Sequence, residues 1–143
     1  MKISICASIQ FTPQIKEISE QLESNGHEVV IPDGAERILR GELTLEEFIY
    51  KSNQGEGSEA KIKHDVIRGY FHKIEQCDAI LVLNFAKKDI ENYIGGNTFL
   101  EMGFAHVLNK KIFVYNPLPD MHYKDELLTF QPIVIDGNLS NLK

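Results

Sequence analysis

The chain has 143 residues, about the size of one ordinary domain, and its 43% hydrophobic content is enough for one sizeable core. We therefore expect a single domain over residues 1–143. The formal charge of −6 and the pI near 5.3 argue against polymeric nucleic acid or an anionic membrane as a partner, because either needs a basic face. A single bound nucleotide is not excluded.

No apolar run approaches the roughly 20 residues that a membrane span needs. The first residues are typical of a strand rather than of a signal peptide, so we expect a cytoplasmic protein. Cys6 and Cys77 lie far apart at no metal-like spacing, which predicts two reduced, mostly buried thiols. His64, Arg68 and His72 share one helix face, but no companion carboxylate or cysteine lies at a suitable spacing, so we expect a solvated face and no metal.

Elements are predicted in the following order. Residues 3–7 form a first strand, and Thr12 with Pro13 begins a helix that Gly26 ends. Residues 27–31 form a second strand, which completes a β-α-β unit. The chain then turns at residues 32–34 into short helices, where Thr44 and Glu47 have capping-box spacing. The polar loop at residues 52–57 is expected to be mobile and to act as a lid.

Residues 58–76 predict another helix, with Ile62, Val66, Tyr70 and Ile74 on one stripe. It leads into an entirely apolar strand at residues 79–83. A helix at 98–108, a strand at 111–115, a helix at 124–129 and a strand at 133–135 follow. This alternation predicts a three-layer α/β/α fold with a mostly parallel, doubly wound sheet of five strands, flavodoxin-like or Rossmann-like, in the order 2-1-3-4-5.

In that order the winding reverses between the first and third strands, so the loops after these two strands flank the ligand crevice. The residues expected to converge there, at the carboxyl ends of the strands, are Ser8, Ile9, Gln10, Asn84, Gly95 and Gly96. Asn84, Asn92 and Asn97 are candidates for hydrogen bonds to a ligand, although asparagine is also a common turn and cap residue.

Glu101 follows the glycine pair in the first turn of the predicted helix, and two interpretations are open. Thr98 and Glu101 have capping-box spacing, so the carboxylate could reach back to its own backbone. Alternatively, a helix that starts at the switch point faces the crevice, and Glu101 turns toward a ligand beside free backbone N–H groups. The position of the helix favours the second interpretation.

With these motifs the chain resembles the nucleoside 2-deoxyribosyltransferase-like family, which includes 2'-deoxynucleoside 5'-monophosphate N-glycosidases. The resemblance rests on residues 5–9, 26–29, 77–82 and 96–105, the last with its Glu-x-Gly-x-Ala core. It implies that Glu101 attacks the anomeric carbon of a deoxyribose and expels the base, and that water or another base resolves the covalent glycosyl-enzyme. It also implies a small nucleoside or nucleotide substrate, no cofactor, and a homodimer or higher homo-oligomer.

Two departures from the family pattern affect this expectation. Tyr70 stands where family members have an acidic residue facing the base, so it is either a core tyrosine or a hydrogen-bond partner of the ligand. If Tyr70 is a core residue, Asp65, His64 or Asp33 must protonate the base. Ser8 matches a residue that holds the 5'-phosphate or sugar, but Gln10 replaces an arginine, which weakens the case for a nucleotide. A binding module without turnover is the alternative to an enzyme.

Overall fold

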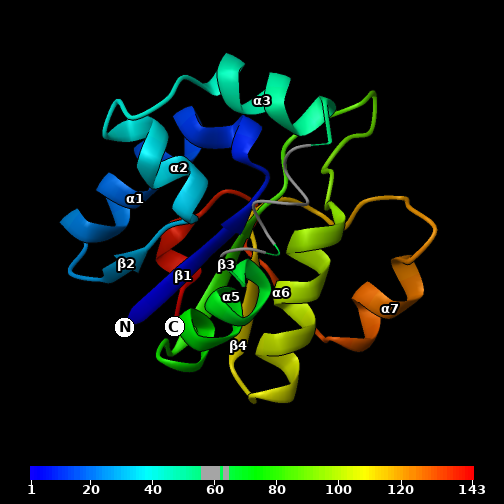
Figure 1. The fold of residues 1–143 in the computed structure, drawn as a ribbon. Helices are drawn as coiled ribbons and strands as arrows, with labels where there is room; N and C mark the ends of the chain where they lie inside the picture. Colours follow the sequence, from blue (N-terminus) through cyan, green and yellow to red (C-terminus); the bar gives the residue numbers. More distant parts are fainter. Residues whose placement is uncertain (56–61, 63–64) are drawn as a thin grey trace.

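A parallel sheet of five strands lies at the centre of the fold (Figure 1). The computed structural model describes residues 1–55, 62 and 65–143. The strand order is β2-β1-β3-β4-β5, and every neighbouring pair is parallel, as the sequence predicts. The strands are β1 (Lys2–Ala7), β2 (Glu28–Val30), β3 (Ala79–Leu83), β4 (Lys111–Val114) and β5 (Ile133–Val134).

Helices cover both faces of this sheet, which makes the predicted three layers (Figure 1). The described helical elements are η1 (Ile9–Phe11), α1 (Thr12–Ser24), α2 (Asp33–Leu39), α3 (Leu45–Asn53), α5 (Val66–Glu75), α6 (Gly96–Val107), α7 (Lys124–Thr129) and η2 (Leu139–Asn141). None of them is both long and apolar enough to cross a bilayer.

Each face of the sheet has its own hydrophobic core. On one face, the β1 residues Ile3 and Ile5 pack with Ile15 of α1 and Ala35 of α2. On the other face, Cys6 of β1 packs with side chains of α5, α6 and α7. Side chains alternate along a strand, so Ile5 and Cys6 point to opposite layers. Cys6 and Cys77 are free and buried, as predicted.

The prediction of one continuous helix over residues 58–76 is wrong at Asp65. Asp65 has φ of 47°, a left-handed conformation that an α-helix does not tolerate, and α5 begins only at Val66. Ile62 is 81% exposed, so it does not extend the buried stripe. Residues 56–61, 63 and 64 lie outside the described part of the chain, and His64 is among them.

Helix α6 begins two residues earlier than predicted, and this changes the interpretation of Glu101. Gly95 is the N-cap and Gly96 the first helical residue, so Glu101 lies in the second turn and no acidic residue occupies the first. Thr98 is already inside the helix, and the capping box proposed for it is therefore wrong. The capping box of Thr44 and Glu47 is confirmed.

The polar segment predicted as a loop at residues 52–57 is also partly wrong. Ser52 and Asn53 are the last residues of α3, which the confirmed capping box starts. Residues 56 and 57 of that segment lie outside the described part of the chain.

Candidate active site

A cavity of about 430 Å³ opens at the carboxyl ends of β1 and β3, where the sheet reverses its winding. Its walls come from the start of η1, from α2, α3, α5 and α6, and from the loop between β3 and α6. The lining residues are Ala7, Ser8, Ile9, Gln10, Pro32, Asp33, Gly34, Arg37, Phe48, Ile49, Ser52, Asn53, Val66, Tyr70, Lys87, Lys88, Tyr93, Gly95, Gly96, Asn97, Thr98 and Glu101. The position and volume of the cavity suit a small molecule.

Glu101 lines the cavity from the second turn of α6 and is only 7% exposed. Burial raises the pKa of its carboxyl group from 4.5 to about 8, while a hydrogen bond with Cys6 and the positive charge of Lys73 lower it in part. The carboxyl group is therefore mostly protonated at neutral pH, and modest changes in its surroundings decide its charge.

Tyr70 lines the same cavity from α5 rather than lying sealed in the core. Burial, together with the nearby carboxylates of Glu101 and Asp33, raises the pKa of its phenol to about 12. The hydroxyl group stays protonated at working pH and can donate a hydrogen bond into the cavity.

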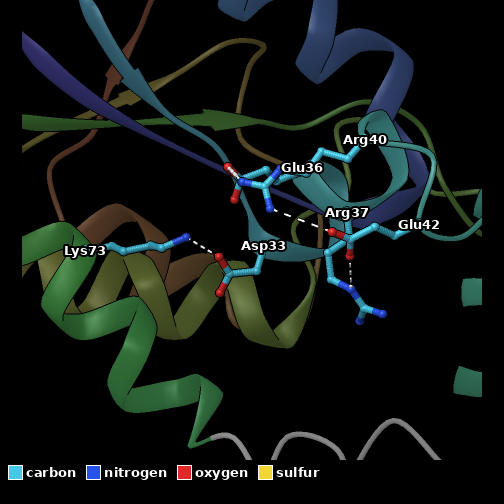
Figure 2. A network of polar contacts seen from close by, with 6 residues as sticks. All are labelled: Asp33, Glu36, Arg37, Arg40, Glu42 and Lys73. Atoms are coloured by element: carbon cyan, nitrogen blue, oxygen red, sulfur yellow. Dashed lines mark hydrogen bonds and ion pairs between the residues drawn. The ribbon is translucent and has the colours of Figure 1, made fainter.

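Asp33 is the first residue of α2 and also lines the cavity. Its carboxylate forms an ion pair with Lys73 of α5 (Figure 2). Arg37, one turn further along α2, lines the cavity and pairs with Glu42 at 3.1 Å between Nε and Oε2. Asp33 is thus held by a cation on a neighbouring helix at the edge of the cavity.

A pair of lysines in the β3–α6 loop adds positive charge that the sequence interpretation missed. Lys87 donates a hydrogen bond from Nζ to Ser8 Oγ at 2.8 Å, and Lys88 lies beside it on the cavity wall. Both ammonium groups lie over the Tyr93 ring, at 5.3 and 5.8 Å from its centroid. Burial, and then the charge of Lys88, lowers the pKa of Lys87.

Most of the other candidate residues line the cavity, but Asn84, Asn92 and Asp65 do not, and His64 lies outside the described residues. Ile9, Gln10, Gly95, Gly96 and Asn97 are on the cavity wall. The prediction is wrong for Asn84, whose buried amide instead bonds Asn116 and the Pro117 carbonyl and so joins the ends of β3 and β4. Asp65 pairs with Arg68 on the exposed surface and does not line the cavity.

Several lining residues carried no local signal. Phe48, Ile49, Ser52 and Asn53 reach the cavity only because α3 packs over η1. Lys87 and Lys88 did carry one, since they follow β3 at the predicted switch point. In the described ranges, no group of three or more His, Cys, Asp or Glu side chains could hold a metal ion.

Comparison with known proteins gives structural matches only. No protein-family model matches the chain, and no curated protein does. A 2-deoxyribosyltransferase from Bacillus psychrosaccharolyticus superimposes with a TM-score of 0.54 at 17% identity, over 85% of this chain and 76% of that one. The CMP N-glycosidase BcmB of Clostridium botulinum superimposes with a TM-score of 0.47 at 15% identity, over 94% of this chain and 85% of that one. The first match establishes that this chain has the fold of a 2-deoxyribosyltransferase, as the sequence resemblance predicts.

Proposed function

We propose that the protein cleaves or transfers the N-glycosidic bond of a deoxyribonucleoside or its 5'-monophosphate, with Glu101 as nucleophile. The observation that carries this proposal is a nearly buried carboxyl group on the wall of a small-molecule cavity at the switch point. A 2-deoxyribosyltransferase with the same fold supports it. A carboxylate nucleophile suits the reaction because it divides one difficult displacement into two easier ones.

In the first step an ionised Glu101 oxygen forms a bond to the anomeric carbon, and the bond to the base nitrogen breaks. The electron pair of that bond leaves with the base, which takes up a proton from the solvent. In the second step water, which gives up a proton to the solvent, or another base attacks the same carbon; the bond to the Glu101 oxygen breaks and its electron pair returns to the carboxylate. Tyr70 donates a hydrogen bond to the departing base, since its hydroxyl is protonated and lies in the same cavity.

This mechanism requires a charged Glu101, so activity should depend on pH. With a pKa of about 8 in the unliganded protein, the ionised fraction increases as the pH rises toward that value. We expect kcat/KM to rise from pH 6 and to level off above pH 8. Initial rates of base release in a series of buffers at constant ionic strength measure this profile, and a flat profile over the same range would contradict it.

We further propose that the 5'-monophosphate is the preferred substrate. Lys87, fixed on Ser8 at 2.8 Å, and its neighbour Lys88 supply positive charge where Gln10 lacks it. Gly96 and Asn97, the first residues of α6, line the same cavity, and no N-cap side chain bonds the first backbone N–H groups of this helix. A phosphate on the 5' carbon would meet this positive end of the cavity.

A substrate comparison tests the preference. Lys87→Met keeps the aliphatic stem and removes the charge, so it should lower kcat/KM for the 5'-monophosphates by roughly tenfold or more and leave the nucleosides nearly unaffected. Lys111→Met is the control, because Lys111 starts β4 and bonds the Lys143 carbonyl away from the cavity. Equal losses on both substrate classes would contradict a phosphate contact.

The primary test is base release. Pure protein is incubated with deoxynucleosides and with their 5'-monophosphates, and free base is separated by chromatography. Base release that disappears in Glu101→Ala and Glu101→Gln, with both variants folded by circular dichroism, supports the proposal. Base release that persists in both variants would show that Glu101 is not the nucleophile.

The second candidate is a nucleotide-binding module without turnover. The raised pKa of Glu101 favours it, because a carboxyl group that is mostly neutral at pH 7 is a poor nucleophile. Thermal stabilisation by deoxynucleotides without any base release, at pH 7 and at pH 9, would establish this reading. The homodimer or higher homo-oligomer that the resemblance implies stays a prediction, which light scattering on the purified protein checks.

A further inference from the structure

The first turn of α2 packs closely against two apolar side chains of the cavity wall. A Cβ atom on Gly34 would lie 3.0 Å from Ile9 Cδ1 and 3.3 Å from Phe48 Cε2, so α2, η1 and α3 meet at this residue. All three residues line the cavity. Ile9 and Phe48 therefore give this part of the wall the apolar surface that the flat face of a base contacts.

Asp33 precedes Gly34 and places a carboxylate beside this apolar surface. The ammonium group of Lys73, which does not line the cavity, bonds Oδ1 of that carboxylate (Figure 2). In the described part of the chain, Oδ2 has no hydrogen-bond or ion-pair partner. The side chain is 53% exposed, so Oδ2 is accessible to a ligand. An ionised carboxylate only accepts hydrogen bonds, so it selects a ligand group that donates one.

Tyr70 supplies a hydrogen-bond donor close to this acceptor. It lies three residues before Lys73 on α5, so the two side chains share a helix face, and Lys73 is the residue that bonds Asp33. Tyr70 lines the cavity, as Asp33 does. Burial, and then the charges of Glu101 and Asp33, raise the pKa of its phenol to about 12, so the hydroxyl group keeps its proton. This part of the wall therefore presents an acceptor and a donor near each other.

We propose that Asp33 is a specificity-determining residue: its carboxylate accepts a hydrogen bond from an exocyclic amino group of the base, while Tyr70 donates one to the neighbouring ring nitrogen. Adenine and cytosine fit this pattern, because each has an amino group next to a ring nitrogen without a proton. Hypoxanthine and uracil have an oxo group in the same place, which would bring a second acceptor against the carboxylate. The substrate class is therefore nucleotides of amino-bearing bases.

This inference rests on the proposed function for the orientation of the substrate. With the 5' position at Lys87 and the anomeric carbon at Glu101, the walls left to surround the base come from α2, α3 and α5. A simpler role for Asp33 is to join α2 to α5 through Lys73, and a partly exposed ion pair of this kind contributes little stability. Breaking that ion pair from either end would affect amino and oxo bases alike, and this difference separates the two roles.

Titration calorimetry with two matched pairs of ligands tests the inference. The pairs are the 5'-monophosphates of deoxyadenosine and deoxyinosine, and those of deoxycytidine and deoxyuridine. Glu101→Gln is the background, so that the ligands stay intact, and chromatography of the cell contents checks this. In each pair that binds, we expect the amino member to bind roughly 10- to 100-fold more tightly than its oxo counterpart.

Two further substitutions in the same background separate the base contact from the ion pair. Asp33→Asn keeps the shape of the side chain but supplies both an acceptor and a donor, so it can bond an amino or an oxo group. We expect the ratio of affinities within a pair to fall to near one. Lys73→Met breaks the same ion pair but leaves the carboxylate on the cavity wall, so the preference for the amino member should remain.

The inference is overturned by equal affinity within a pair, by tighter binding of the oxo member, or by no binding of any of the four nucleotides. Equal loss of the preference in Asp33→Asn and Lys73→Met would assign Asp33 to the ion pair alone. Base release by the wild type is measured separately with the same nucleotides. A preference in binding without base release would refute the proposed function and leave this inference standing. Base release without a preference in binding would refute only the role of Asp33.

Discussion

At the scale of single residues, two side chains of the cavity have complementary protonation states. Glu101 must lose its proton to act as a nucleophile, and burial opposes that loss. Tyr70 must keep its proton to serve a departing base, and the same burial, with the neighbouring carboxylates, secures it. A low-dielectric cavity thus opposes the ionisation of Glu101 and keeps Tyr70 protonated, so the proposed mechanism requires substrate binding to favour the charged form of Glu101.

Tyr70→Phe isolates the contribution of the hydroxyl group. The ring remains on the cavity wall, so we expect a change in the free energy of unfolding of less than about 1 kcal/mol. Because one donor to the leaving group is lost, kcat should fall by roughly 10- to 100-fold while KM changes little. Steady-state kinetics of base release measures this. A variant that loses stability but keeps kcat would instead assign Tyr70 to packing.

At the scale of elements, a substitution of Gly96 at the start of α6 should affect protein stability and ligand binding in opposite directions. A Cβ atom on Gly96 would meet no atom within 4 Å, and its backbone is already helical. Gly96→Ala should therefore stabilise the protein by about 0.4–1 kcal/mol through the unfolded state. The added methyl group would project into the cavity that Gly96 lines, so substrate binding should weaken.

Gly69→Ala is the matched control for this prediction. Gly69 lies within α5, a Cβ atom there would also meet nothing within 4 Å, and the residue does not line the cavity. We expect a similar or slightly larger stabilisation, about 1 kcal/mol, with unchanged affinity for a 5'-monophosphate. Urea unfolding and titration calorimetry on both variants provide the comparison. Equal affinity in Gly96→Ala would show that the helix start is not in contact with the ligand.

The elements also show what the sequence predicts well. Each buried strand is a short apolar run, and the right-handed connections between parallel strands leave few possible orders, so the sheet order was predictable. Helix starts were harder, because they depend on backbone conformation. The left-handed turn at Asp65 and the N-cap at Gly95 leave only weak traces in residue type.

The site was predictable where topology defines it. Ser8, Gln10, Gly96 and Glu101 follow from the switch point. The contact between Lys87 and Ser8 joins residues 79 positions apart, and a lysine in a loop ordinarily indicates a solvated surface. The prediction for Asn84 was wrong because its side-chain amide bonds backbone groups of the loop after β4. That loop is 32 residues away in sequence, so the local sequence around Asn84 does not indicate the contact.

At the scale of the whole molecule, a buried Glu101 couples the candidate active site to global stability. The carboxyl group keeps its proton in the folded protein up to about pH 8, but in the unfolded chain it releases the proton near its ordinary value of 4.5. The unfolded state therefore binds fewer protons between these values, and the free energy of unfolding falls as the pH rises through that window. At about 1.36 kcal/mol per pH unit, the full loss is roughly 5 kcal/mol.

Glu101→Gln should abolish this dependence. The variant is expected to resemble the wild type near pH 4.5 and to be more stable by several kcal/mol at pH 8 and above, because an amide costs no ionisation when buried. Urea unfolding at pH 5, 6.5 and 8 gives the two curves, and Glu17→Gln on α1 serves as the exposed control that should follow the wild type. Parallel curves for wild type and Glu101→Gln would mean that Glu101 ionises as freely in the folded protein as in the unfolded chain. We expect the variant to be inactive at every pH. The difference in the free energy of unfolding between the variant and the wild type at pH 8 would then measure how much stability the protein loses by keeping an ionisable carboxyl group in this cavity.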